Sequence, residues 1–141
     1  MPSEILIDFS AMRIAQADCQ DRYPDEACGL LIGEGNRIVR AVAAGNSWAI
    51  QGERRRRFTI DPAAQMRTER SLDGTGSQVM GTYHSHPDHP AEPSAFDLEA
   101  AWPVYLYLIL SVSADEVREV RGWRIDEATG RFAEVGIHVV E

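Results

Sequence analysis

The amino-acid sequence predicts a single mixed α+β domain, with a central, mostly antiparallel β-sheet flanked by two longer helices and one short helix. Three observations lead to this prediction. Short apolar or alternating segments, typical of strands, are interspersed with segments that carry helix-start signals. The 141 residues suit one domain, and 44% of them are hydrophobic, which is enough for a core. No repeat, low-complexity tract or linker divides residues 1–141.

The first part of the chain is expected to place one helix between strands. Residues 5–7 form a short first strand, and Ser10 can cap a helix that Pro24 ends. The continuous apolar run 28–33 is typical of a buried strand. Residues 37–44 are expected to return beside it after a turn.

The middle of the chain combines an irregular segment with a second helix. Residues 45–57 are polar and irregular, and residues 58–60 can form a strand edge. Asp61 followed by Pro62 is a helix-start signal, with a cap and then a proline at the first helical position. The helix should reach about residue 72.

The last part supplies the short helix and the remaining strands. Residues 78–86 are expected to form a strand, and Ser94 can cap a short helix after a proline-rich loop. Residues 104–112 are apolar and rich in β-formers, and 118–125 and 132–140 should pair across a turn.

The composition argues against several partners and compartments. The chain has 14 arginines, no lysine and 22 acidic residues, for a net charge of −8, which argues against nucleic-acid and membrane partners. Two cysteines, Cys19 and Cys28, do not make a disulfide framework. We find no signal peptide and no apolar run long enough for a bilayer, so a cytoplasmic protein is expected. The sequence indicates no particular oligomeric state.

Three of the four histidines lie in residues 81–97. Alternate residues of a strand point to one face, so His84 and His86 should project together while Ser85 points into the fold. Asp97, in the first turn of the short helix, can add an oxygen ligand. Two histidines and one carboxylate leave a position for water, as in catalytic zinc sites, although such a set also suits iron or manganese.

These residues also match a known family pattern. His84 and His86 precede Asp97 by a ten-residue spacer that contains Ser94, and this arrangement resembles the JAMM signature of the MPN+ metallopeptidases. Glu26, in the run P-D-E-A-C-G-L-L-I-G, lies where that family has its upstream glutamate. The resemblance is strongest to the stand-alone bacterial Mec-type branch. It implies a cytidine-deaminase-like MPN/JAMM fold over nearly the whole chain.

The resemblance implies a role for each of these residues. His84, His86 and Asp97 would bind Zn²⁺, one ion per chain. Glu26 would act as the general acid/base that takes a proton from water and passes it to the leaving amine. Ser94 would donate a hydrogen bond to the tetrahedral oxyanion.

Each residue also has a purely structural explanation. The two histidines could be satisfied by backbone groups at a sheet edge, and Ser94 and Asp97 could do no more than cap a helix. From the residues alone, Glu26 is not distinguished from its neighbour Asp25.

The resemblance further implies a substrate. It points to hydrolysis of the amide bond after the C-terminal Gly-Gly of a ubiquitin-like (ThiS/MoaD-like) sulfur-carrier protein, removing an amino acid such as cysteine or a short extension. A Gly-Gly tail fits a narrow groove and can add to a strand edge. Two alternatives are a catalytically silent MPN scaffold in a complex and a hydrolase of another small amide or of a nucleobase amine. The paired-cysteine motif of nucleobase deaminases is absent.

One further feature stands out by its charge. Arg54, Arg55, Arg56 and Arg57 are consecutive, and they form either a solvated loop or a docking patch for an acidic partner or a C-terminal carboxylate. His89, in the proline-rich loop, is expected to face a substrate or solvent.

Overall fold

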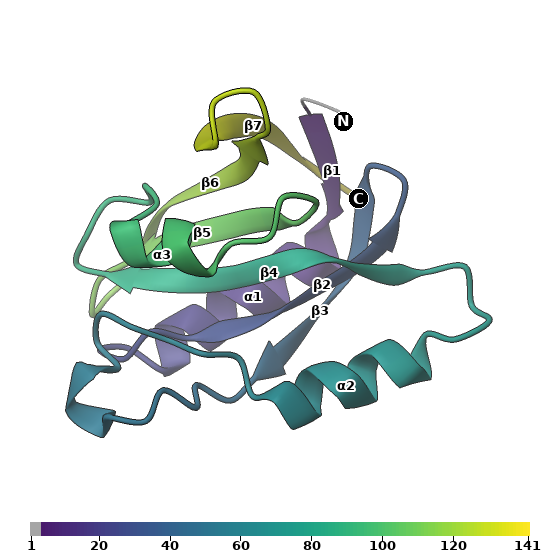
Figure 1. Cartoon of the computed structure of the whole chain (residues 1–141). Helices are drawn as coiled ribbons and strands as arrows, with labels where there is room; N and C mark the ends of the chain where they lie inside the picture. Colours follow the sequence, from purple (N-terminus) through teal and green to yellow (C-terminus); the bar gives the residue numbers. More distant parts are fainter. Residues whose placement is uncertain (1–3) are drawn as a thin grey trace.

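A computed structural model describes residues 4–141 and places the strands of this range in a closed barrel in the order β1-β3-β2-β4-β5-β6-β7 (Figure 1). The strands are β1 (Glu4–Asp8), β2 (Cys28–Glu34), β3 (Arg37–Ala44), β4 (Gln78–Pro87), β5 (Leu106–Val112), β6 (Val117–Asp126) and β7 (Arg131–Val140). The β1–β3, β1–β7 and β4–β5 pairs are parallel and the other pairs are antiparallel. The mixed α+β class is confirmed, but the expectation of a plain sheet is wrong, because β1 closes the circle between β3 and β7.

Three α-helices accompany the barrel in the described part of the chain: α1 (Phe9–Asp21), α2 (Pro62–Ser71) and α3 (Ala95–Ala100); a short 3-10 helix, η1, covers Gln51–Glu53. In Figure 1, α1 lies behind the strands, and α2 lies in front of them near β4. The buried residues of α1 lie on one face, whereas α2 contributes no buried residue. The first helix therefore packs on the core and the second lies on the outside.

The helix starts follow local chemistry, with one correction. Asp61 caps α2 by accepting a hydrogen bond from the Ala63 backbone nitrogen at 3.1 Å, as predicted. For α1 the predicted cap Ser10 is wrong, because the helix begins at Phe9 and Asp8 holds the capping position. The Asp8 side chain makes no cap and instead accepts a hydrogen bond from Arg37 at 2.7 Å.

The side chain of Tyr83 explains part of the glycine-rich β2 sequence. Gly29 pairs with Tyr83 across the β2–β4 ladder, and a Cβ at residue 29 would collide with the Tyr83 ring. The ring is fully buried, and its hydroxyl donates to Asp18 on α1 at 2.7 Å. Since Tyr83 points into the core, its neighbour His84 must point to the other face of β4.

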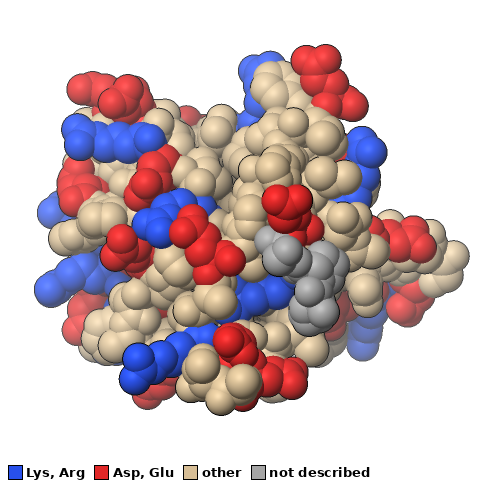
Figure 2. Space-filling view, turned by 90° about the horizontal axis from the view of Figure 1, so that it is seen from above, with Lys and Arg blue, Asp and Glu red and all other residues tan. Residues whose placement is uncertain are grey.

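The surface carries both signs of charge. On the face shown in Figure 2, arginine and acidic side chains are intermixed. None of the helices between residues 4 and 141 has the length and apolar character needed to cross a membrane.

Candidate metal centre and active-site pocket

The two histidines near the end of β4 and one carboxylate from α3 meet at one point. The Nε2 atoms of His84 and His86 lie 3.2 Å apart. Asp97 places Oδ1 3.3 Å from the His84 Nε2 and Oδ2 3.1 Å from the His86 Nε2. All three side chains are almost completely buried. Such a cluster of lone pairs is stable only when a proton or a cation is shared among them.

The second nitrogen of His86 determines which atom is free to bind a metal. Its Nδ1 lies 2.9 Å from the carbonyl oxygen of Pro90, which can only accept a hydrogen bond. Nδ1 therefore carries the proton, and in the neutral ring Nε2 presents its lone pair to the cluster. Burial opposes protonation of His86, but the hydrogen bonds to Asp97 and Pro90 raise its pKa on balance.

His84 is held differently. Its ring stacks on Phe58 with a centroid distance of 4.4 Å, and its Nδ1 is buried without a hydrogen-bond partner among the described residues. Burial lowers the pKa of His84 and so favours the neutral ring that a metal requires.

The start of α3 orients Asp97. Ser94 and Asp97 form a capping box in which the Ser94 nitrogen donates to Asp97 Oδ2 at 2.8 Å and the Asp97 nitrogen donates to Ser94 Oγ at 3.1 Å. Burial would raise the pKa of Asp97, but His84, His86 and the Ser94 backbone outweigh it and hold the pKa well below its usual range. The Ser94 hydroxyl accepts in this box, so its proton remains available to another acceptor.

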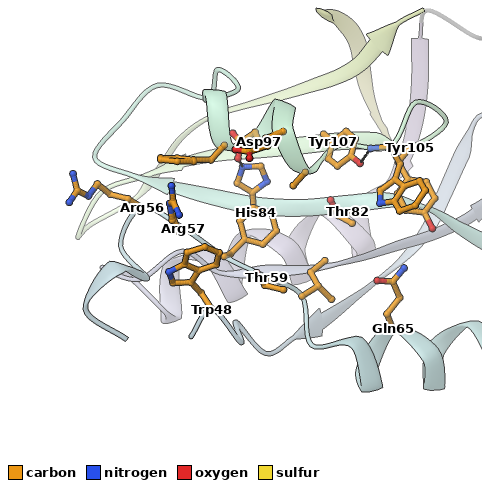
Figure 3. Close-up of a pocket in the computed structure, with 16 residues that line it drawn as sticks. Trp48, Arg56, Arg57, Thr59, Gln65, Thr82, His84, Asp97, Tyr105 and Tyr107 are labelled. Carbon is orange, nitrogen blue, oxygen red and sulfur yellow. Dashed lines mark hydrogen bonds and ion pairs between the residues drawn. The ribbon is translucent and has the colours of Figure 1, made fainter. Parts of the chain in front are cut away.

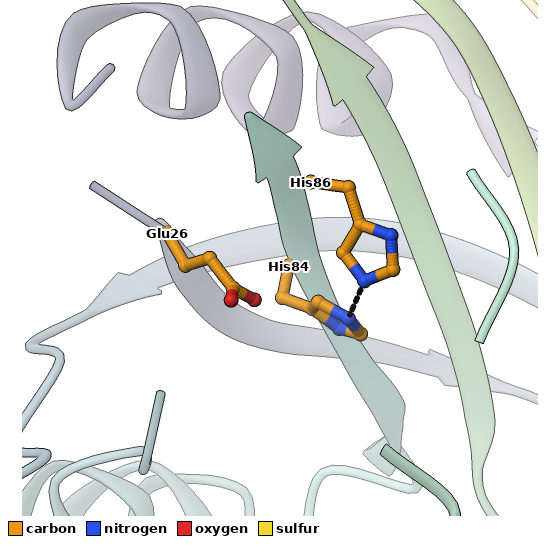
Figure 4. A group of neighbouring side chains, drawn as sticks. All are labelled: Glu26, His84 and His86. Carbon is orange, nitrogen blue, oxygen red and sulfur yellow. Dashed lines mark hydrogen bonds between the residues drawn. The ribbon is translucent and has the colours of Figure 1, made fainter. Parts of the chain in front are cut away.

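Glu26 faces the histidine pair from the segment that precedes β2 (Figure 4). Ligand atoms of Glu26, His84 and His86 all lie within 4.8 Å of one another. Glu26 is 3% exposed, and its Oε1 has no hydrogen-bond partner in the described range. Burial raises its pKa to about 8, with His86 opposing the shift and Asp97 adding to it. The residue is thus an unpaired buried carboxyl beside a group of metal-type ligands.

Two ligand sets share the histidines. One adds Glu26, and the other adds Asp97, whose oxygens lie 3.1 and 3.3 Å from the two Nε2 atoms. Asp97 fits the ligand position better because each of its oxygens already faces one ring nitrogen. Two imidazole nitrogens and a carboxylate match the donors of a divalent metal site.

The backbone near Glu26 is bonded to the polar segment between β3 and α2. Asn46 donates from its amide nitrogen to the carbonyls of Glu26, at 3.1 Å, and Arg57, at 3.0 Å. The Glu26 nitrogen donates to the carbonyl of Arg54 at 2.6 Å. Ser85 points inward, as predicted, and its Oγ accepts from the Ala27 nitrogen at 2.8 Å.

A pocket of about 510 Å³ opens beside His84 and Asp97 (Figure 3). Its wall is rich in aromatic residues: Trp48, Phe58, Phe96, Trp102, Tyr105 and Tyr107. Thr82 also lines it, two residues before His84, and its buried hydroxyl has no hydrogen-bond partner among the described residues. The pocket is therefore largely apolar, with polar groups at His84 and Asp97.

The four consecutive arginines do not act as one patch. Arg54 donates from Nε to the carbonyl of Trp48 at 2.9 Å, and Arg55 is exposed outside the pocket. Arg56 and Arg57 line the pocket. His89 is exposed and does not line it.

Three aromatic residues near the centre, Trp48, Phe58 and Phe96, were not singled out from the sequence. Phe58 stacks on His84, and the Arg57 guanidinium lies over the rings of Phe96, at 3.4 Å, and Trp48, at 4.8 Å. For two of these residues the sequence carries a signal in their position next to predicted site residues. Phe96 directly precedes Asp97, and Phe58 directly follows the arginine run.

Comparison with known proteins places this geometry in a family. Residues 10–126 match the model described as prokaryotic homologues of the JAB domain. The chain belongs to this family. The match confirms the JAMM/MPN+ resemblance and, together with the curated relatives, the predicted enzyme class of hydrolase.

Two curated relatives and one solved structure resemble the chain over most of its length. A desampylase of Haloferax volcanii is 34% identical over 118 residues, covering 82% of this chain and 79% of the relative. A CysO-cysteine peptidase of Mycobacterium tuberculosis is 32% identical over 123 residues, covering 84% and 80%. A solution structure of a protein from Desulfitobacterium hafniense has a TM-score of 0.79 and 29% identity, covering 97% of this chain and 93% of that one.

Proposed function

We propose that this protein is a zinc-dependent peptidase or isopeptidase that hydrolyses the amide bond after the C-terminal Gly-Gly of a ubiquitin-like sulfur-carrier protein. The observation that carries the proposal is the convergence of His84, His86 and Asp97 beside the buried carboxyl of Glu26, next to a pocket that His84 and Asp97 line. The relatives named desampylase and CysO-cysteine peptidase support a substrate of this kind.

The residues present fit one zinc ion. His84, His86 and Asp97 would hold it through two nitrogens and a carboxylate, and the Pro90 carbonyl already sets the tautomer of His86 that ligation requires. A bound zinc ion lowers the pKa of a water molecule and polarises the scissile carbonyl.

Glu26 is the proposed general acid/base. Its pKa of about 8 in the metal-free protein reflects burial, and a nearby cation lowers that value toward the range in which the carboxylate can accept a proton. The carboxyl would take the proton from water and deliver it to the amine as the C–N bond breaks. Ser94 keeps a hydroxyl proton that it could donate to the oxyanion.

The closed barrel restricts how an extended tail can bind. Every described strand is paired on both sides over at least part of its length, so the barrel offers the tail no complete free strand edge to extend. The residues Phe58, Thr59 and Ile60 line the pocket outside the barrel, and Ile60 forms an isolated bridge with Asn46, two residues after β3 ends. We therefore propose that a ThiS/MoaD-like tail lies along residues 58–60, where glycines pass the aromatic wall without a side-chain clash.

The alternative of a silent scaffold explains less. A scaffold gains nothing from burying the Glu26 carboxyl, whose Oε1 has no hydrogen-bond partner among residues 4–141, because such burial costs stability. The net charge of −8 is also in keeping with a cytoplasmic enzyme that acts on a protein and binds neither nucleic acid nor a membrane surface.

The test combines metal content with product analysis. The full chain is loaded with zinc, measured by elemental mass spectrometry, and incubated with a sulfur-carrier protein extended past Gly-Gly. We expect about one zinc per chain and loss of the extension in the wild type. Glu26→Gln should keep zinc without turnover, Asp97→Ala should lose both, and the control Asp25→Asn should keep both. A wild type that binds no zinc and cleaves nothing refutes the proposal.

A further inference from the structure

We infer that Arg57 binds the free α-carboxylate of the departing amino acid, an inference that rests on the proposed function. The site would then prefer a carrier extended by one C-terminal residue over a carrier joined to a lysine side chain. Arg57 is thus the residue that selects the leaving group.

The guanidinium of Arg57 is fixed in place without using its hydrogen-bond donors. Its central carbon lies 3.4 Å from the centroid of the Phe96 ring and 4.8 Å from that of Trp48, so aromatic faces from two separate segments hold the group. Stacking of this kind orients the plane and leaves the N–H groups at its edge free. A planar fork with free N–H groups matches the two oxygens of a carboxylate.

In the described residues, no carboxylate forms an ion pair with the Arg57 guanidinium. In the described range, Arg22, Arg37 and Arg121 form ion pairs with acidic side chains, whereas Arg57 forms none and donates no side-chain hydrogen bond. Glu99 also lines the pocket, but it is exposed and does not pair with Arg57. Arg57 is therefore an unpaired cation, held rigidly at the wall of a pocket.

Two phenylalanines link this cation to the candidate metal ligands. Phe96, which Arg57 covers, directly precedes Asp97, and Phe58, which directly follows Arg57, stacks on His84. In Figure 3, Arg57 lies on one side of His84, and Thr82, Tyr105 and Tyr107 lie on the other. The site thus has a cationic end at Arg57 and an opposite end with Thr82, Tyr105 and Tyr107, which suit the carboxylate of a leaving group and an extended tail respectively.

The chemistry of the leaving group gives the selectivity. When one amino acid follows Gly-Gly, its carboxylate is two bonds from the amide nitrogen that departs. When the nitrogen belongs to a lysine side chain, four methylene groups follow it and no carboxylate lies near. A bidentate contact to Arg57 is available only in the first case.

The experiment compares two substrates that differ only in this charge. One is a sulfur-carrier protein ending Gly-Gly-Ala with a free carboxylate, and the other is the same protein ending in the carboxamide. We expect zinc-loaded wild type to show a kcat/KM about tenfold or more higher for the free acid, the effect of one charge-assisted hydrogen-bonded pair. Arg57→Gln should bring the ratio to about one, and Arg57→Lys should lower it because lysine cannot bond bidentately.

A matched control and a second readout complete the test. Arg55→Gln removes the same charge from the same segment outside the pocket, and it should keep the wild-type ratio. Fluorescence anisotropy with labelled Gly-Gly-Ala peptides should show the same preference for the acid in metal-free wild type, lost in Arg57→Gln.

The outcomes separate the two ideas. A wild-type ratio near one, or a ratio that survives in Arg57→Gln, overturns the role of Arg57. Cleavage of neither substrate refutes the proposed function, and the anisotropy preference then decides the role of Arg57 by itself.

Discussion

Replacing Glu26 by glutamine should make the metal-free protein more stable while it abolishes hydrolysis. Burial raises the pKa of Glu26 from its ordinary value of 4.5 to about 8. Between these values the unfolded chain releases the proton while the folded chain keeps it bound, so the wild type loses stability as the pH rises. The loss is absent below pH 4.5, grows by about 1.4 kcal/mol per pH unit, and is complete above pH 8.

The magnitude at neutral pH follows directly. Because pH 7 lies 2.5 units above 4.5, the wild type should have lost about 3 kcal/mol there. Glutamine has a similar shape, carries no charge and does not titrate. The free energy of unfolding of Glu26→Gln should therefore exceed that of the wild type by an amount that increases with pH.

Urea denaturation followed by circular dichroism, at pH 5, 6, 7 and 8 in the presence of a chelator, measures this difference. Asp25→Asn is the matched control, since it removes one carboxylate from the same segment at a position that is only half-buried. A difference between Glu26→Gln and the wild type that stays constant with pH would contradict the reasoning.

Three further outcomes are expected. Ser94→Ala should lower the free energy of unfolding by about 1 kcal/mol through loss of the capping box, which urea denaturation measures. Because the proposed oxyanion donor is lost as well, kcat in steady-state kinetics should fall about a hundredfold or more. Tyr83→Phe should cost about 1–3 kcal/mol in a urea titration, because Asp18 loses the hydroxyl that donates to it. Chelation should abolish hydrolysis, and added zinc should restore it and raise Tm in a thermal melt, since zinc binds the folded state.

The local parts of the fold could be predicted from the sequence because their signals are local. The apolar run of β2 and the Asp61–Pro62 helix start each depend on neighbouring residues. The closure of the barrel could not, because it depends on β1 pairing with both β3 and β7 across most of the chain. The start of α1 could not be predicted, because Asp8 and Ser10 are both residue types that favour the capping position. The helix begins directly after Asp8, although the Asp8 side chain is bonded to Arg37 and makes no cap.

The candidate site divides in the same way. The spacing of His84, His86 and Asp97 predicts a shared metal site, and in the structure the three side chains lie together. The position of Arg57 between two aromatic rings could not be predicted, since Trp48 and Phe96 come from segments far apart in the chain.

The hydrogen bonds of Asn46 limit how the specificity of this protein could be changed by mutation. Its amide nitrogen bonds to the carbonyls of Glu26 and Arg57, while its oxygen accepts from the backbone nitrogens of Trp48 and Thr59. The amide nitrogen of one side chain thus links the backbone of Glu26, the proposed general acid/base, to the backbone of Arg57, the residue proposed to select the leaving group. A library that randomises this segment to obtain new specificities should keep position 46 fixed, because variants that lose Asn46 would be discarded for poor turnover before any new preference could be detected.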